Sequence, residues 1–173
     1  VISAVGAAAD ATTNAVALTV QRTFSITSQP SNATADEGGT AQFSVSTSSS
    51  SGTVTYQWER SDDGGSNYAS VGATGQAAVF TTPTLVFDND NLDRYRVVAS
   101  LVGAAADITS THGELTVLRV ISISSQPTST AVIEGQTATF AIGAAITSGS
   151  ISYQWQISTC LLYTSDAADD LIG

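Results

Sequence analysis

Residues 40–58 read TAQFSVSTSSSSGTVTYQW, and this stretch decides the fold class. Every second residue is apolar in residues 40–45, and the same alternation returns in residues 54–58. A period of two places apolar side chains on one face of a β-strand, so Phe43 and Trp58 each belong to an apolar face. The stretch therefore predicts two half-buried strands separated by a Ser-rich loop.

Short apolar runs of the same kind lie on both sides of this stretch. Residues 62–65, DDGG, have the composition of a turn, because Gly adopts positive φ without steric cost. No helical periodicity longer than one turn is present. About seven short strands separated by turn residues predict an all-β sandwich. The further predicted strand segments are residues 24–26, 79–80, 85–87, 95–99 and 114–117.

A long internal repeat organises the chain. Residues 1–20, VISAVGAAADATTNAVALTV, return as VASLVGAAADITSTHGELTV at residues 98–117, an offset of 97. The same offset relates the YQW of residues 56–58 to residues 153–155. A period near 100 residues has the size of one small sandwich domain. The predicted organisation is the last strands (F and G) of a preceding repeat at 1–20, a complete repeat at 21–118, a truncated repeat (strands A to C) at 119–159, and a tail at 160–173.

The complete repeat resembles an immunoglobulin-like domain of the kind repeated in bacterial surface proteins and phage virion proteins. Four motifs carry the resemblance: EGGTAQF at 37–43, YQW at 56–58, DRYRV at 93–97 and LTV at 115–117. The resemblance implies an antiparallel immunoglobulin-like β-sandwich in which the Tyr95 hydroxyl bonds to upstream backbone. The implied core residues are Phe43, Trp58, Tyr95, Val97 and Leu115.

The repeat departs from antibody-type domains at the intersheet disulfide. Phe43 and Val97 stand where those domains carry the two Cys, so apolar packing on Trp58 takes the place of the bridge. Loss of such a bridge typically costs roughly 2–5 kcal/mol. Apolar burial, at about 25 cal/mol per Å², has to offset that cost. A repeat without Cys folds in any redox compartment.

The tail does not match the repeat. From Cys160 the string CLLYTSDAAD resembles the translation of a transposon-end sequencing adapter, and we expect residues 160–173 to lie outside the fold. Excluding them removes the one Cys and leaves 12 acidic residues against five Arg. The truncated repeat then has no partner strands for Trp155 and is expected to be poorly ordered or aggregation-prone. An alternative is that residues 1–20 pair with the strands after Arg119.

Composition excludes several classes of protein. The five basic residues are all Arg and are scattered, so they form no basic patch for nucleic acid. No apolar run approaches the roughly 20 residues of a membrane helix, and one Cys makes no disulfide scaffold. No secretory signal is visible, and Val1 is expected to be an internal start.

His112 is the strongest catalytic candidate and is still a poor one. It is the single His of the chain, and the preceding repeat has Ala15 at the matching position. No second base, thiol or metal-ligand spacing accompanies it. We expect a surface histidine and a protein that is not an enzyme.

Asp88, Asp90 and Asp93 are the candidate metal ligands. They lie in the run DNDNLD, which offers hard oxygen ligands to Ca²⁺ but lacks the Gly and the distal Glu of an EF-hand loop. A calcium site between repeats would also need acids in residues 23–27, where there are none. The preferred interpretation is a polar turn in which Asp93 bonds local backbone, with no cofactor.

The candidate binding loops are residues 47–52, 62–75 and 103–112. They are rich in Ser, Thr, Gly and Asn, a composition that suits adaptable hydrogen bonding, although solvated loops share it. The candidate binding residues are Asp62, Asp63, Asn67 and Tyr68. Asn32 begins a glycosylation sequon that does not recur in the next repeat, which indicates an accidental match.

These observations favour a non-enzymatic structural and adhesion module. The expected setting is a repeat array of a phage virion protein that contacts neighbouring repeats and, weakly, host-surface glycans. The alternatives are a bacterial cell-surface adhesin or stalk, and a spacer domain of a secreted carbohydrate-active enzyme. A virion, extracellular or cell-surface location is expected, with no nucleic-acid partner and no membrane insertion.

Overall fold

The computed structural model describes residues 1–6, 8–9 and 12–158, and the predicted tail from Cys160 lies outside these residues. The chain divides into two units, Val1–Val120 and Ile121–Gly173. The repeat boundaries predicted from the sequence stay predictions. Among the described residues, no helix is long and apolar enough to cross a membrane.

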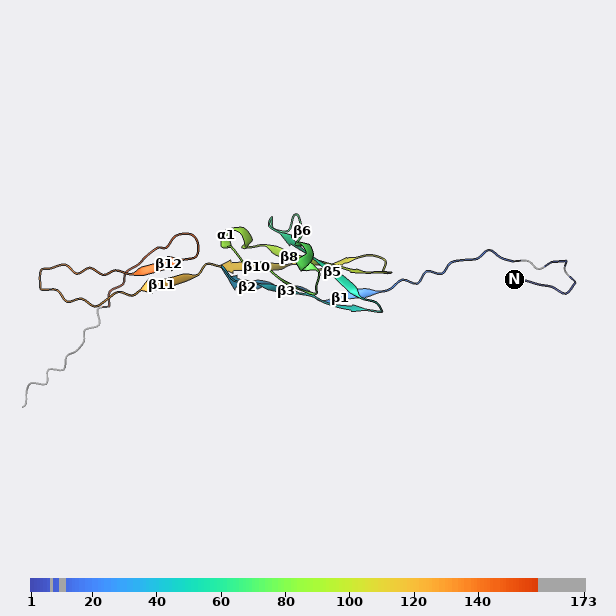
Figure 1. The fold of residues 1–173 in the computed structure, drawn as a ribbon, viewed down its shortest axis with the longest axis horizontal. Coiled ribbons are helices and arrows are strands. Elements are labelled where there is room, and N and C mark those ends of the chain that lie inside the picture. Colours follow the sequence, from blue (N-terminus) through green and yellow to red (C-terminus); the bar gives the residue numbers. More distant parts are fainter. Residues whose placement is uncertain (7, 10–11, 159–173) are drawn as a thin grey trace, which may run out of the picture. The chain divides into compact units, whose positions relative to one another are not determined.

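The first layer of unit 1 consists of two antiparallel strand pairs (Figure 1). Strand β1 (Phe24–Ser28) pairs with β4 (Ser46–Ser49), and β3 (Gln42–Ser44) pairs with β7 (Val79–Thr81). β3 and β4 are two parts of one strand interrupted at Val45, whose N–H donates to the carbonyl of Ala78 at 2.9 Å. This layer contains strands A, B and E of an immunoglobulin-like domain.

The second layer has the strand order β2-β10-β8-β5-β6, with β9 paired to β8. In this order G, F and C are neighbours in the layer opposite A, B and E, which is the immunoglobulin arrangement. The prediction of an all-β immunoglobulin-like sandwich is confirmed. The bounds are β2 (Ala33–Asp36), β5 (Val54–Ser61), β6 (Ala69–Ser70), β8 (Arg94–Leu101), β9 (Ile108–Thr109) and β10 (Gly113–Leu118).

One pair in this layer is parallel, where the sequence predicted an antiparallel sandwich. The chain leaves β1, passes the buried Pro30, and continues in the opposite layer as β2, which runs parallel to β10. Side chains hold the crossing: Gln29 accepts from the N–H of Thr111 and Asn32 from the N–H of Glu114, both at 2.9 Å. A strand that changes layers without reversing direction meets the last strand in parallel.

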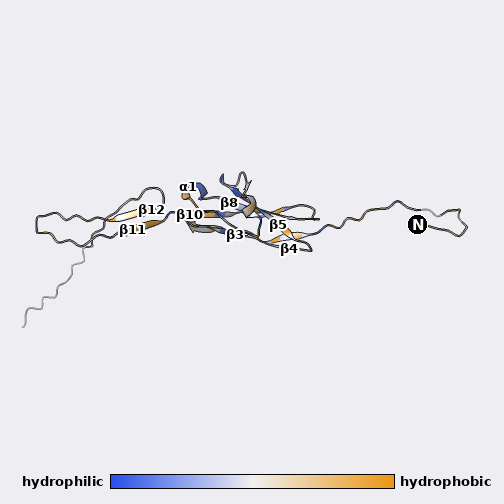
Figure 2. Cartoon of the chain, viewed as in Figure 1, coloured by the Kyte–Doolittle hydropathy of each residue, from blue (hydrophilic) through white to orange (hydrophobic). Residues whose placement is uncertain are grey.

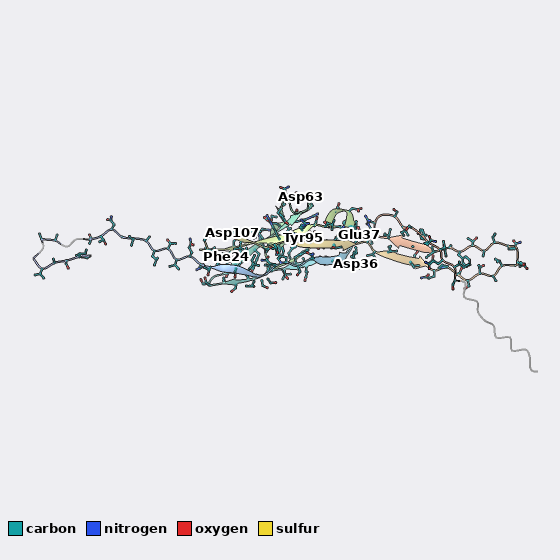
Figure 3. The ribbon with its side chains drawn as sticks, turned by 180° about the vertical axis from the view of Figure 1, so that it is seen from behind. Phe24, Asp36, Glu37, Asp63, Tyr95 and Asp107 are labelled. Carbon is teal, nitrogen blue, oxygen red and sulfur yellow. The ribbon has the colours of Figure 1, made fainter. Side chains whose placement is uncertain are left out.

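Aromatic rings fill the space between the layers. Phe43 stacks on Tyr95 with ring centroids 4.7 Å apart, and Trp58 stacks on Phe80 at 6.1 Å. Every second residue of β8 is buried, as the alternation in the sequence requires. Figure 3 labels Tyr95 within this sandwich. The buried cluster comprises Ala41, Phe43, Val45, Trp58, Phe80, Leu85, Tyr95, Val97, Leu115 and Val117.

Residues 85–87 do not form the predicted strand. Leu85 is buried and its N–H donates to the carbonyl of Gly39 at 2.9 Å, but the chain then turns into α1 (Phe87–Asp90). The Asp90 carboxylate accepts the N–H of Val86 at 2.7 Å and so closes the turn. The sequence predicts a strand here because an apolar run does not show this local hydrogen bond. A second short helical segment, η1 (Gly72–Gly75), follows β6.

Unit 2 repeats part of unit 1 in the same geometry. Strand β11 (Ile121–Ser125) pairs with β12 (Gly143–Ile146) in the register of β1 and β4 at the offset of 97, including the bulge. The ring centroids of Phe140 and Trp155 lie 6.5 Å apart at 46°, against 6.4 Å and 46° for their counterparts in unit 1. Figure 2 colours β11 as hydrophobic, and its residues are exposed.

Candidate functional site

A pocket in unit 1 lies beside the tip of the β5–β6 turn. Its volume is about 580 Å³. The end of β5, strand β6, η1 and the segment from Pro83 to Asp90 form its walls, and Phe80, Leu85 and Tyr95 are its apolar lining. Three predicted binding residues, Asp62, Asn67 and Tyr68, line the pocket together with Asp90. The fold thus gathers candidates that the sequence had placed in two separate loops.

Arg60 connects the pocket to the turn that precedes β8. Its Nε lies 2.5 Å from Asp93 Oδ2, and its Nη2 lies 3.3 Å from Asp90 Oδ1. The same Nη2 donates to the carbonyl of Asn89 at 2.9 Å. One guanidinium therefore ties strand β5 to both carboxylates and to the backbone of α1, a geometry that the planar donor fork of Arg favours.

Burial determines the charge behaviour of Asp93. Its side chain is 3% exposed, and the loss of solvation raises its pKa to about 6 although the cation of Arg60 acts in the opposite direction. Burial also raises the pKa of Tyr95 well above its usual range, with the nearby Asp93 charge adding to the effect. Asp93 does not line the pocket itself, but it is paired with Arg60, which does.

Tyr68 is held in place by a cation. The guanidinium of Arg96 lies 3.7 Å from the centroid of the Tyr68 ring, and Arg96 Nε pairs with Glu59 at 2.8 Å. Glu59 and Arg96 are directly opposite each other on β5 and β8. A cation over an aromatic face stabilises the pair and fixes the ring orientation. Tyr68 is therefore a pre-oriented aromatic wall of the pocket.

Asp63 shapes the β5–β6 turn instead of facing a ligand. Its carboxylate accepts hydrogen bonds from Ser61, from the N–H of Ser66, and from both the backbone and side chain of Asn67 at 2.7–2.9 Å. These bonds, the backbone N–H of Asn67 first, hold the pKa of Asp63 well below its usual range. Figure 3 labels Asp63 at this turn. Both Asp63 and Asn67, predicted as binding residues, are thus occupied by the turn itself.

The candidate calcium ligands are engaged by arginines. Asp88 pairs with Arg119 at 2.7 Å, while Asp90 and Asp93 share Arg60. Within the described ranges, no group of three or more His, Cys, Asp or Glu is placed to hold a metal ion. The expected bond from Asp93 to local backbone is replaced by its ion pair with Arg60. Pairing with fixed cations removes the negative charge that would attract Ca²⁺.

The five predicted core residues lie inside the sandwich. Phe43, Trp58, Tyr95, Val97 and Leu115 are each at most 2% exposed. The predicted hydrogen bond from the Tyr95 hydroxyl to upstream backbone is not found among the described residues. The predicted position is thus occupied by a buried tyrosine, without the corner hydrogen bond.

Sequence reasoning missed Arg60, although a signal was present. The inward-facing row of β5 reads Val54, Tyr56, Trp58, Arg60 at a spacing of two. A charged residue at an inward position requires a buried partner of opposite charge. That partner, Asp93, is distant in sequence but stands beside the corner tyrosine. His112, in contrast, is exposed in the loop before β10.

Comparison with known proteins finds similarity in fold at low identity. No family model and no curated protein matches the chain. A chimeric titin Z1Z2 functionalised with a KLER exogenous peptide from decorin is 18% identical with a TM-score of 0.42, and the match covers 73% of this chain and 65% of that one. The chain therefore spans slightly less than two thirds of the titin chimera.

Two further solved structures contain immunoglobulin domains. Sidekick-1 immunoglobulin domains 1–4 are 13% identical with a TM-score of 0.45, over 64% of this chain and 28% of that chain. Domain D1 of Duf (Kirre) is 20% identical with a TM-score of 0.39, over 56% of this chain and 97% of that chain. These are low-identity structural matches to immunoglobulin-like domains.

Proposed function

We propose that the chain is a non-enzymatic structural and adhesion module. In this proposal, immunoglobulin-like repeats are joined in tandem on the surface of a phage virion. Each complete repeat contacts host-surface glycans weakly through the pocket beside Tyr68. The proposal rests on that pocket.

The chemistry of the pocket matches a sugar ring. Tyr68 offers an aromatic face and a hydroxyl, and Arg96 fixes its orientation. Asp62, Ser70 and Thr74 supply polar groups at the rim above an apolar lining. A sugar presents apolar C–H faces together with hydroxyl groups, so a wall of this mixed character suits it better than a purely charged or purely apolar ligand.

The arrangement of charges supports binding over catalysis. Of the two Asp residues that line the pocket, Asp62 and Asp90, the second is paired with Arg60, which also pairs with Asp93. A pair of carboxylates that hydrolysed a glycosidic bond would need one group free to give a proton and the other free to stabilise charge. The tandem repeat adds avidity instead, because linked weak sites can raise binding by roughly 10²–10⁴.

Display of the full chain on a multivalent bead tests this proposal against a panel of bacterial-surface glycans. We expect the displayed chain to bind clearly and the free chain to bind only weakly. Tyr68→Ala is expected to reduce binding of the displayed chain at least tenfold. Tyr153→Ala is the matched control, since Tyr153 is an exposed tyrosine outside the pocket. Asp62→Asn probes the rim without changing the size of the side chain.

The outcomes separate adhesion from a spacer role. Binding that survives Tyr68→Ala would place the contact elsewhere, and absence of binding to every glycan by the multivalent display would leave a spacer role. In both cases circular dichroism of the variants establishes that the sandwich is folded.

A further inference from the structure

Asp62 is the one charged side chain of the unit 1 pocket that has no partner among the described residues. The charged lining consists of Arg60, Asp62 and Asp90, and the first and last of these are paired at 3.3 Å. Asp62 follows the end of β5, is exposed, and makes no hydrogen bond or ion pair within residues 1–6, 8–9 and 12–158. One positive and two negative charges line the pocket, so a single negative charge remains for a ligand.

The arginines at and beside the pocket are already neutralised. Arg60 lines the pocket and Arg96 stacks on its aromatic wall, while Arg94 lies against the β5–β6 turn. Each is paired with a carboxylate: Arg60 with Asp90 and Asp93, Arg94 with Glu114, and Arg96 with Glu59. A ligand anion would have to compete with these carboxylates and would also meet the charge of Asp62. The electrostatics of the pocket therefore disfavour an anionic ligand.

The turn that carries Asp62 is held in one shape. The neighbouring Asp63 carboxylate accepts four hydrogen bonds from within the turn, each 2.7–2.9 Å long. Tyr68 follows in the same turn, and the Arg96 guanidinium lies 3.7 Å from its ring centroid. The backbone of Asp62 and the ring of Tyr68 are therefore positioned before a ligand arrives, so that little ordering entropy opposes binding.

We propose that the pocket selects a sugar that carries a free ammonium group, and that Asp62 sets this selectivity. The selectivity rests on the proposed glycan binding and defines the chemical class of the ligand, an amino sugar whose nitrogen is not acetylated. The sugar ring contacts Tyr68 and the apolar lining, and the ammonium group donates a charge-assisted hydrogen bond to the Asp62 carboxylate. A neutral sugar lacks this ion pair, and a uronic acid meets repulsion in its place.

An organic ammonium group fits the pocket better than a metal ion does. Ca²⁺ takes about six to eight oxygen ligands, and no group of three or more His, Cys, Asp or Glu in the described part of the chain is placed to hold a metal. An ammonium group is satisfied by one carboxylate together with neutral acceptors. Ser70 and Thr74 line the same pocket, and their hydroxyl groups are acceptors of this kind. The polar lining therefore suits a single positive charge on a sugar.

Multivalent display of the full chain tests this selectivity with three matched probes. They are a glucosamine oligosaccharide, its fully N-acetylated form and a galacturonic acid oligosaccharide of the same length, in a mildly acidic buffer that keeps the amine protonated. We expect the glucosamine form to bind about fivefold more tightly than the acetylated form, as one partly shielded ion pair allows, and the galacturonic acid form to bind most weakly. Added salt should reduce the preference, because it screens the ion pair.

Asp62→Asn is expected to lower the ratio of the glucosamine and acetylated affinities from about five to about one, since it removes the charge and keeps the size of the side chain. Asp36→Asn is the matched control. Asp36 is an exposed aspartate at the end of β2, outside the pocket, and Figure 3 labels it apart from the turn of Asp63. This variant changes the net charge equally and should keep the ratio of the natural chain. Circular dichroism verifies that both variants are folded.

Other results overturn the selectivity in distinguishable ways. Equal binding of the glucosamine and acetylated forms, with Tyr68→Ala still weakening both, removes the role of Asp62 and leaves the glycan site standing. Absence of binding to all three probes overturns the amino-sugar class, whereas the wider glycan panel decides the proposed function. A preference that Asp62→Asn and Asp36→Asn lower equally reflects the net charge of the chain and contradicts a site in the pocket. Equally tight binding of a Lys-rich peptide shows attraction of any cation and overturns recognition of a sugar.

Discussion

Trp58 is fully buried, and its indole nitrogen donates a hydrogen bond to the carbonyl of Ala77 at 2.9 Å. Its ring lies between Phe80 and Phe43, with centroids 6.1 and 6.4 Å away. Trp58 therefore stabilises the contact between the two layers through its buried ring, and its indole N–H keeps a hydrogen-bond partner in the core. This packing occupies the place that a disulfide holds in antibody-type domains.

Trp58→Ala is expected to lower the free energy of unfolding by about 3–5 kcal/mol, because the cavity cannot collapse fully. Urea unfolding followed by circular dichroism measures the change. Trp155→Ala is the control: the same residue type in the same local motif, but half exposed, should cost about 1 kcal/mol or less. Equal costs at the two positions would contradict the difference in burial.

Asp93 makes stability depend on pH in the opposite direction from most acidic residues. Its pKa is about 6 in the folded protein against 3.8 ordinarily, so the folded state takes up a proton that the unfolded state does not bind between these pH values. This contribution is present at low pH and is lost as pH rises through 6. Between pH 7 and pH 5 it should add about 1 kcal/mol.

The measurement compares the natural chain with Asp93→Asn, which cannot ionise. The free energy of unfolding of the natural chain, minus that of the variant, should increase as pH falls from 7 to 5. If the free energies of unfolding of the two proteins change with pH in the same way, Asp93 has the same pKa in the folded and unfolded states, which contradicts the prediction. Above pH 6, where Asp93 is ionised, Asp93→Asn also removes the charged partner of Arg60.

At the scale of elements, β3 and β8 face each other from opposite layers. Phe43 and Val97 both belong to the buried cluster, at the positions of the intersheet disulfide in antibody-type domains. Val97 lies opposite Trp58 in the ladder of β5 and β8, while Val98 lies on the other face of β8. Val97 and Val98 are therefore adjacent positions whose side chains point to opposite faces of β8, so each is a control for the other.

Phe43→Cys with Val97→Cys should close a disulfide under mild oxidation in a Cys160→Ser background. Phe43→Cys with Val98→Cys should not, because its two Cβ atoms point apart. Counting free thiols in the folded protein distinguishes the two. Closure of the Val98 pair and not the Val97 pair would show that β8 is one residue out of register.

At the scale of the molecule, the two units differ in how completely their apolar residues are covered. Unit 1 buries its aromatic cluster, whereas Phe140 and Trp155 of unit 2 are about half exposed and β11 is exposed along its length. Local stability follows the amount of buried apolar contact. The same repeated sequence is therefore expected to have different stability in its two contexts.

Amide hydrogen exchange in dilute solution should show this difference. Protection in β5 and β8 is expected to approach the global free energy of unfolding, and protection in β11 and β12 to be at least tenfold lower. Equal protection of the two units at high dilution would contradict their difference in burial.

The sequence by itself determined the sandwich class, the period and the core. Alternation in residues 40–58 and the offset of 97 are local or linear signals, and burial of Phe43 and Trp58 follows the first directly. It also predicted Asp62 and Tyr68 as binding residues, and both line the pocket of unit 1. It did not predict that Asp63 and Asn67 are used by their own turn, because that depends on where each amide points.

The tertiary structure alone decided the pocket, the ion pairs and the parallel strand. Arg60 meets Asp93, and Arg96 covers Tyr68, only after strands distant in sequence align in register. The sequence suggested a polar turn or a cation site at residues 88–93. The structure has a turn there, closed by Asp90, and folding brings arginines to its carboxylates. Periodicity fixes which face of a strand is buried. Which charged side chains meet depends on the pairing of strands that are distant in sequence, and no local sequence pattern encodes that pairing.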